Sequence, residues 1–140
     1  MDLAAIEGAL RSVLERRADV RFAYLFGSTV TRDPATARDV DVAVSFTVSP
    51  SLFAVGELAT SLEGVLGREV DVVDLDDATT LLRWEVVRSG RVLMAPDPRA
   101  LAEFRARVPL EYLELKPHLE RQAAGLRRVL RERAWSVSTS

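Results

Sequence analysis

Three aspartates stand in apolar surroundings that ordinarily exclude charge. Asp39 and Asp41 lie one residue apart in "DVDVAVSF" (residues 39–46), and Asp71 lies in "EVDVVDL" (residues 69–75). Residues two apart on a strand share a face, so all three converge if the two strands are neighbours. Close carboxylates repel one another unless a cation lies between them, and oxygen-only ligands suit Mg²⁺ or Mn²⁺. The pattern predicts a metal-binding patch.

A glycine and a serine end the apolar run that precedes these aspartates. "VRFAYLF" (residues 20–26) is rich in aromatic and β-branched residues, and Gly27 and Ser28 follow it directly. Glycine lets a bound group approach the backbone, while a helix start and a serine hydroxyl both donate hydrogen bonds to an anion. A phosphate cradle beside three carboxylates predicts two-metal phosphoryl or nucleotidyl transfer.

The elements that would position these residues alternate between helix and strand through the first 95 residues, which favours an α/β sheet. Strands are expected at residues 20–26, 39–46, 69–75 and 91–95, and helices at 2–17, 51–66 and 78–89. Asp2 is placed to cap the first helix, Gly67 to end the second, and Asp76 or Asp77 to cap the third.

Beyond residue 97 the pattern becomes purely helical. We expect a helix over residues 99–107, an interruption at Pro109, and a last helix with Pro117 in its first turn. An apolar stripe on that last helix is predicted to dock onto the sheet domain or another helix; it consists of Leu119, Ala123, Leu126 and Leu130. We therefore divide the chain into a core over residues 1–97 and a helical extension of the same domain over residues 98–140.

The size and composition of the chain predict one folded domain, with 140 residues of which 48% are hydrophobic. It has no cysteine, which excludes disulfides and thiolate metal sites. It shows neither a basic and apolar leader nor an apolar run of about 18–20 residues. We expect a cytoplasmic protein that does not engage a membrane.

Charge is distributed unevenly between the two parts. Residues 1–97 carry 10 basic and 16 acidic side chains, whereas residues 98–140 carry 9 and 5. The net charge of −2 argues against a protein that coats a polyanion. The basic C-terminal part is explained either by a partner-binding surface or by a solvated helix face, and both explanations stay open.

The combination of these motifs resembles a known signature. Gly27, Ser28, Asp39 and Asp41 match G-S-x(10)-D-x-D of the polymerase-β-type nucleotidyltransferases, with Asp71 as the third carboxylate. The ending "VVRSGRVLMAPDP…EFRAR…YLELKPHLERQ" is similar to the minimal nucleotidyltransferases that are paired with HEPN-domain toxins. Two positions depart from the usual pattern: the family often has Gly where Asp33 stands, and Ser or Thr where Arg38 stands.

The resemblance implies a polymerase-β-like fold, with a mixed sheet flanked by helices and a C-terminal helical extension. It implies an antitoxin that transfers AMP from ATP to a tyrosine of a HEPN ribonuclease toxin, with which it forms a complex. Two Mg²⁺ ions, or Mn²⁺, would be held by the catalytic residues Asp39, Asp41 and Asp71. The nucleotide would be bound by Gly27, Ser28 and Arg32. No direct contact with nucleic acid is expected.

Two alternatives remain at this point. The chain would neutralise its partner by binding alone if the nucleotide site were vestigial, although a disused site has no physical reason to keep three mutually repelling acids. Transfer to a small molecule such as an aminoglycoside usually needs a second substrate-binding domain, and little chain follows the predicted sheet.

Overall fold

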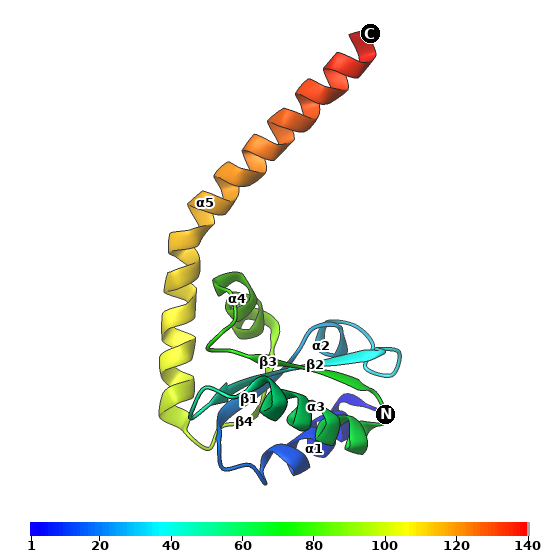
Figure 1. Ribbon diagram of the computed structural model, residues 1–140, viewed down its shortest axis with the longest axis vertical. Coiled ribbons are helices and arrows are strands. Elements are labelled where there is room, and N and C mark those ends of the chain that lie inside the picture. Colours follow the sequence, from blue (N-terminus) through cyan, green and yellow to red (C-terminus); the bar gives the residue numbers. More distant parts are fainter. Residues whose placement is uncertain (140) are drawn as a thin grey trace.

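The computed structural model describes the backbone of residues 1–139 and the side chains of residues 1–134. The strands in this part of the chain form a mixed sheet with the order β3-β2-β1-β4 (Figure 1). Their bounds are β1 Val20–Phe26, β2 Asp39–Phe46, β3 Glu69–Asp74 and β4 Arg91–Met94. β1 runs antiparallel to both β2 and β4, whereas β2 and β3 are parallel.

Helices cover both faces of the sheet (Figure 1). Their bounds are α1 Leu3–Leu14, α2 Ser28–Thr31, α3 Leu52–Leu66, α4 Thr80–Ser89 and α5 Pro98–Thr139. α1 and α3 pack on one face through a core that includes Ile6, Leu10 and Leu62. α4 and the first part of α5 pack on the other face, where Phe22, Tyr24 and Phe104 lie together. The predicted mixed sheet, with flanking helices and a helical C-terminal extension, is confirmed.

Two of the predicted helix ends are confirmed by their capping contacts. Asp2 Oδ1 accepts a hydrogen bond from the Ala5 N–H at 2.8 Å, and α1 then ends at Leu14 rather than at residue 17. Gly67 ends α3 with φ 68°, in the left-handed region that glycine adopts without strain.

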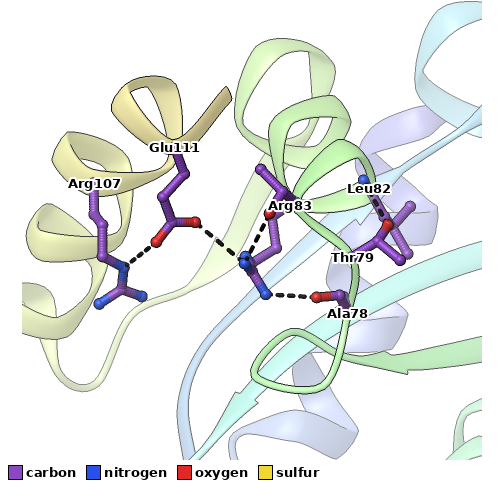
Figure 2. A network of polar contacts seen from close by, with 7 residues as sticks. Ala78, Thr79, Leu82, Arg83, Arg107 and Glu111 are labelled. Carbon is purple, nitrogen blue, oxygen red and sulfur yellow. Dashed lines mark hydrogen bonds and ion pairs between the residues drawn. The ribbon is translucent and has the colours of Figure 1, made fainter. Parts of the chain in front are cut away.

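The predicted cap of the helix after β3 is wrong. Thr79, not Asp76 or Asp77, caps α4, because its Oγ1 accepts a hydrogen bond from the Leu82 N–H at 3.2 Å (Figure 2). The two aspartates belong to the turn that leaves β3. There Asp74 accepts hydrogen bonds from the Asp76 N–H through Oδ1 and from the Asp77 N–H through its carbonyl, each at 3.1 Å.

The predicted break in the C-terminal part is also wrong, because α5 is one helix that continues through Pro109 and Pro117. Each proline lacks an N–H, so the carbonyl four residues earlier loses its helical partner. Strong helix formers surround both positions, and the helix bends instead of ending. Figure 1 shows its axis changing direction where yellow passes into orange, in the segment that contains Pro117.

Only the first part of α5 is packed within this chain. Leu101, Phe104 and Val108 are buried, at the spacing of one helix face. The predicted stripe further along does not dock onto the sheet, since Leu126 and Leu130 are 61% and 56% exposed. The helix instead leads away from the body of the molecule (Figure 1).

Candidate active site

β2 carries two of the predicted site residues on one face. Val40, Val42 and Val44 are completely buried in the core that α1 and α3 cover. On the opposite face, Asp39 is exposed and Asp41 is half-buried. Strand alternation requires this arrangement, because residues two apart share a face. The valines hold β2 in the sheet and leave the aspartates at the surface.

The parallel pairing of β2 with β3 brings the third predicted residue beside them. Asp41 is the register partner of Asp71, and Asp39 is the register partner of Glu69. Neighbouring strands lie about 4.8 Å apart, so the side chains of Asp41 and Asp71 leave the sheet next to each other. The three aspartates therefore share one face at one end of the β2–β3 pair.

The electrostatics of this face single out Asp41. Burial raises the pKa of the Asp41 carboxyl above its ordinary value, and the negative charges of Asp71 and Asp39 raise it further. Each cause opposes the charged form of Asp41, since one removes water and the other adds repulsion. A cation or a positively charged ligand group would relieve both.

Gly27 packs directly against this carboxylate. Phe26 is the register partner of Asp41, so the turn that follows β1 begins opposite the aspartate. Gly27 has φ 78°, and a Cβ built on it would overlap the Asp41 Oδ2. Both the backbone conformation and the lack of space require glycine at this position.

Two of the residues that are predicted to bind phosphate, Ser28 and Arg32, line a depression next to the Gly27 turn. Its volume is about 290 Å³, and its lining includes Ser28, Arg32 and Arg38. Ser28 opens α2, a helix of one turn in which the N–H groups of Val30 and Thr31 donate to the Gly27 carbonyl. Arg38 is thus an additional candidate for anion binding. In the sequence, the feature that indicates this role for Arg38 is its position directly before Asp39.

The loop that carries Arg32 and Arg38 is held by a distant arginine. Arg68 Nη1 donates to the Pro34 carbonyl at 2.7 Å and to the Ala37 carbonyl at 3.3 Å. Asp33 Oδ1 also accepts a hydrogen bond from the Ala35 N–H at 3.0 Å. Asp33, one of the two departures from the family pattern, therefore stabilises a turn inside this loop. The role of Arg68 carried no signal in the sequence.

The chemistry of the site fits a divalent cation. Among the side chains of residues 1–134, no three acidic or histidine groups are gathered closely enough to enclose an ion as they stand. Asp39 and Asp71 are exposed, and repulsion between unneutralised carboxylates favours their separation. The donors are oxygens alone, and burial together with the negative charges of Asp71 and Asp39 raises the pKa of the Asp41 carboxyl, a cost that a bound cation would relieve. Such a set suits Mg²⁺ or Mn²⁺.

Comparison with known proteins settles the family. The profile described as polymerase beta, nucleotidyltransferase matches residues 9–99, a range that contains the Gly27–Ser28 turn and all three aspartates. The chain belongs to this family. This match confirms the polymerase-β-like fold that the resemblance implied. In the part of the chain that is described, no helix is long and apolar enough to cross a membrane.

Relatives of this nucleotidyltransferase include named adenylyltransferases. It is 39% identical over 70 residues to "Protein adenylyltransferase MntA" of Shewanella oneidensis, an alignment that covers 50% of either chain. It therefore matches about half the length of this curated relative.

Solved structures of toxin–antitoxin complexes match a larger part of this chain than the curated relative does. A toxin–antitoxin with AMP-PNP matches at a TM-score of 0.70 and 30% identity, covering 84% of this chain and 94% of the other. A tri-AMPylated Shewanella oneidensis HEPN toxin in complex with an MNT antitoxin matches at a TM-score of 0.67 and 28% identity. That match covers 85% of this chain and 92% of the other. The similarity thus extends beyond residues 9–99.

Proposed function

We propose that this nucleotidyltransferase is an antitoxin that transfers AMP from ATP to a tyrosine hydroxyl of a cognate HEPN ribonuclease toxin. The observation that carries the proposal is the register pairing of Asp41 with Asp71, beside a Gly27 turn that admits no side chain. The similarity to protein adenylyltransferase MntA and to the complex with a tri-AMPylated toxin supports the choice of reaction and partner. ATP and a ribonuclease toxin are both encountered in the cytoplasm, where we place the reaction.

Each predicted site residue receives a role in this proposal. Gly27, Ser28 and Arg32 bind the triphosphate, and Asp39, Asp41 and Asp71 hold two Mg²⁺ ions, or Mn²⁺ in their place. When bound, such ions offset the charge of the phosphate oxygens and orient them. The oxygen-only donor set and the mutual repulsion of the carboxylates support this assignment.

The reaction balances as a displacement at phosphorus. The tyrosine oxygen forms a bond to the α-phosphorus of ATP, and the bond from that phosphorus to the bridging oxygen of the β-phosphate breaks. Pyrophosphate leaves with the electron pair, and the proton of the hydroxyl passes to the Asp71 carboxylate as general base. Asp71 suits this role because it is exposed at the surface, where an incoming protein side chain has access.

Incubation with labelled ATP, Mg²⁺ and the toxin encoded by the neighbouring gene tests the function. The wild-type chain should label the toxin, and Asp39→Asn or Asp71→Asn should reduce labelling on the order of 10²-fold or more. Asp71→Asn should retain Mg-ATP binding, whereas Asp39→Asn should weaken it. Asp77→Asn, an exposed aspartate in the turn after β3, is the matched control and should label at the wild-type rate. Wild-type labelling by Asp39→Asn would refute the site.

Neutralisation by binding alone is the second candidate, and the extended α5 favours it because much of its surface is uncovered in this chain. The triple variant Asp39→Asn, Asp41→Asn, Asp71→Asn separates the two functions. If transfer is the mechanism, cells that express the toxin are rescued by the wild-type chain and not by the variant. Equal rescue by both proteins would select binding alone.

A further inference from the structure

The outer part of α5, residues 113–134, forms an arm that the fold does not use. The arm begins directly after Tyr112, whose ring stacks on Trp84 of α4 with centroids 4.5 Å apart. From there the helix extends away from the sheet on the side of α4 (Figure 1). At 1.5 Å per residue the arm is about 33 Å long, enough to present several helical turns to another molecule.

One face of the arm carries a regular apolar seam. Leu119, Ala123, Leu126 and Leu130 follow one another at intervals of four, three and four residues. An alternation of four-residue and three-residue intervals is the pattern by which one helix packs along another. Leu126 and Leu130 are more than half exposed, so this chain alone leaves the seam in water. A second helix laid along the seam would bury this apolar surface.

The charged residues around the seam indicate which kind of partner helix could bind to it. At 100° per residue, Arg127 and Arg133 lie at the two edges of the seam, whereas Arg121 and Arg128 lie on the opposite side. All four are exposed, and none forms an ion pair within residues 1–134. A second copy of this chain would bring the edge arginines toward one another, which is repulsive. A partner helix with an apolar stripe bordered by aspartate or glutamate would pair with them.

The base of the arm is fixed to the body by a polar network. Arg83 of α4 donates to Glu111 Oε2 at 3.1 Å, and its other contacts are the Ala78 carbonyl and Thr80 Oγ1 (Figure 2). Glu111 also pairs with Arg107 at 3.2 Å. The arm therefore leaves the body in a defined direction, which suits a surface that must hold a partner in place.

We propose that the arm is the docking surface for the protein substrate, through an acidic-edged amphipathic helix of the toxin laid along the seam. This inference rests on the proposed function, which supplies the toxin as partner. Seating the toxin on the arm raises the local concentration of its acceptor hydroxyl at the three aspartates. The arm thus acts on substrate capture and not on the chemical step.

Steady-state AMP transfer by the full chain, with the toxin concentration varied, tests the docking surface. The double variant Leu126→Asp, Leu130→Asp should raise the KM for toxin at least tenfold, with unchanged kcat and unchanged ATP affinity. Arg127→Glu, Arg133→Glu should do the same and should weaken the salt dependence of toxin binding. The matched reversal Arg121→Glu, Arg128→Glu changes net charge equally and should have the smaller effect.

Leu52→Asp is the control for the apolar change, because Leu52 is a 93% exposed leucine on α3 and should leave the KM unchanged. Melting temperatures of all variants should equal that of the wild type, which separates lost docking from lost folding. Toxin binding by the seam variant at wild-type affinity would overturn the inference. A homodimer of the chain alone that the seam variant abolishes would also overturn it.

The proposed function and the docking surface can fail separately. If the wild-type chain transfers no AMP, the function fails, and direct titration of toxin onto the wild-type and seam-variant chains still decides the docking surface. If wild-type transfer is normal and the seam variant shows an unchanged KM for toxin, the docking surface fails and the function stands.

Discussion

At the scale of single residues, the site depends on a contact that only glycine permits. Gly27→Ala would place a Cβ against the Asp41 Oδ2 and strain a backbone with φ 78°. We expect a lower melting temperature and a loss of nucleotide binding, because the turn and the carboxylate must both move. Gly56→Ala is the control: it lies inside α3 with open space around it. It should stabilise the protein by about 0.5–1 kcal/mol, as measured by thermal unfolding.

The burial of Asp41 among like charges predicts an opposition between stability and activity. Because the folded protein raises the pKa of Asp41, ionisation of this carboxyl at neutral pH opposes folding. Asp41→Asn should therefore raise the melting temperature in metal-free buffer while reducing AMP transfer on the order of 10²-fold.

The same linkage fixes the pH dependence of this gain. The difference in melting temperature between Asp41→Asn and the wild type should be largest at neutral pH. It should shrink as the pH falls through the raised pKa, and vanish below the unfolded-state value of about 3.9, where the wild-type carboxyl is protonated in both states. A variant less stable than the wild type at neutral pH would contradict the raised pKa of Asp41.

At the scale of elements, the loop of residues 32–38 depends on Arg68. Arg68→Ala removes two hydrogen bonds to the carbonyls of Pro34 and Ala37. The loop carries Arg32 and Arg38, so its displacement should weaken ATP binding. We expect the affinity for ATP to fall roughly tenfold, which corresponds to a loss of about 1.4 kcal/mol in binding free energy. Isothermal titration with Mg-ATP measures this.

Arg16→Ala serves as the control for the loop variant, because Arg16 is an exposed arginine on the other face of the sheet. It should bind Mg-ATP as the wild type does. Arg68→Lys keeps the charge but lacks the planar guanidinium that reaches two carbonyls, and it should restore only part of the affinity. Unchanged ATP binding in Arg68→Ala would show that the loop keeps its position without this contact.

The elements also show how far a sequence can be interpreted. The bounds of β1 and β2 were predicted to the residue. β1 is enclosed by Asp19 and Gly27, and the alternating pattern of β2 begins after Arg38 and ends before Thr47. Thr79 was missed as a cap because Asp76 and Asp77 offered equivalent side chains nearby, and only the hydrogen bonds distinguish them. Arg68 could not be found from its own neighbours, since its partners lie more than thirty residues away.

The continuity of α5 could not be predicted for a different reason. Pro109 and Pro117 locally disfavour a helix by about 3 kcal/mol each, which predicts breaks at both positions. The strong helix formers around them and the packing of Val108 outweigh that local preference, and this sum over many residues is not visible at the prolines themselves.

At the scale of the whole molecule, α5 has one part inside the fold and one part outside it. We propose that the sheet and the first part of α5 are a single folding unit, as the predicted division at residue 97 into a core and its own extension implies. Phe104→Ala should lower the free energy of unfolding by about 3–5 kcal/mol, because its ring is buried beside Phe22 and Tyr24.

Leu126→Ala on the same helix should change the free energy of unfolding by less than about 0.5 kcal/mol, because this side chain is mostly exposed. Denaturant unfolding of both variants checks the pair of values. Equal destabilisation by the two variants would show that the outer part of α5 folds against the body after all.

The helical hydrogen bond is missing at Pro117, beyond the base that Arg83 and Glu111 fix, so this is the point at which α5 bends most easily. The stretch from Pro117 to Ala134 measures about 26 Å at 1.5 Å per residue, so a change of about 10° in the bend shifts its far end by about 4–5 Å. That displacement is comparable to the width of an aromatic ring, and it leaves every contact of the sheet intact. A bend at this point would therefore move the outer part of the helix and leave the position of the three aspartates unchanged.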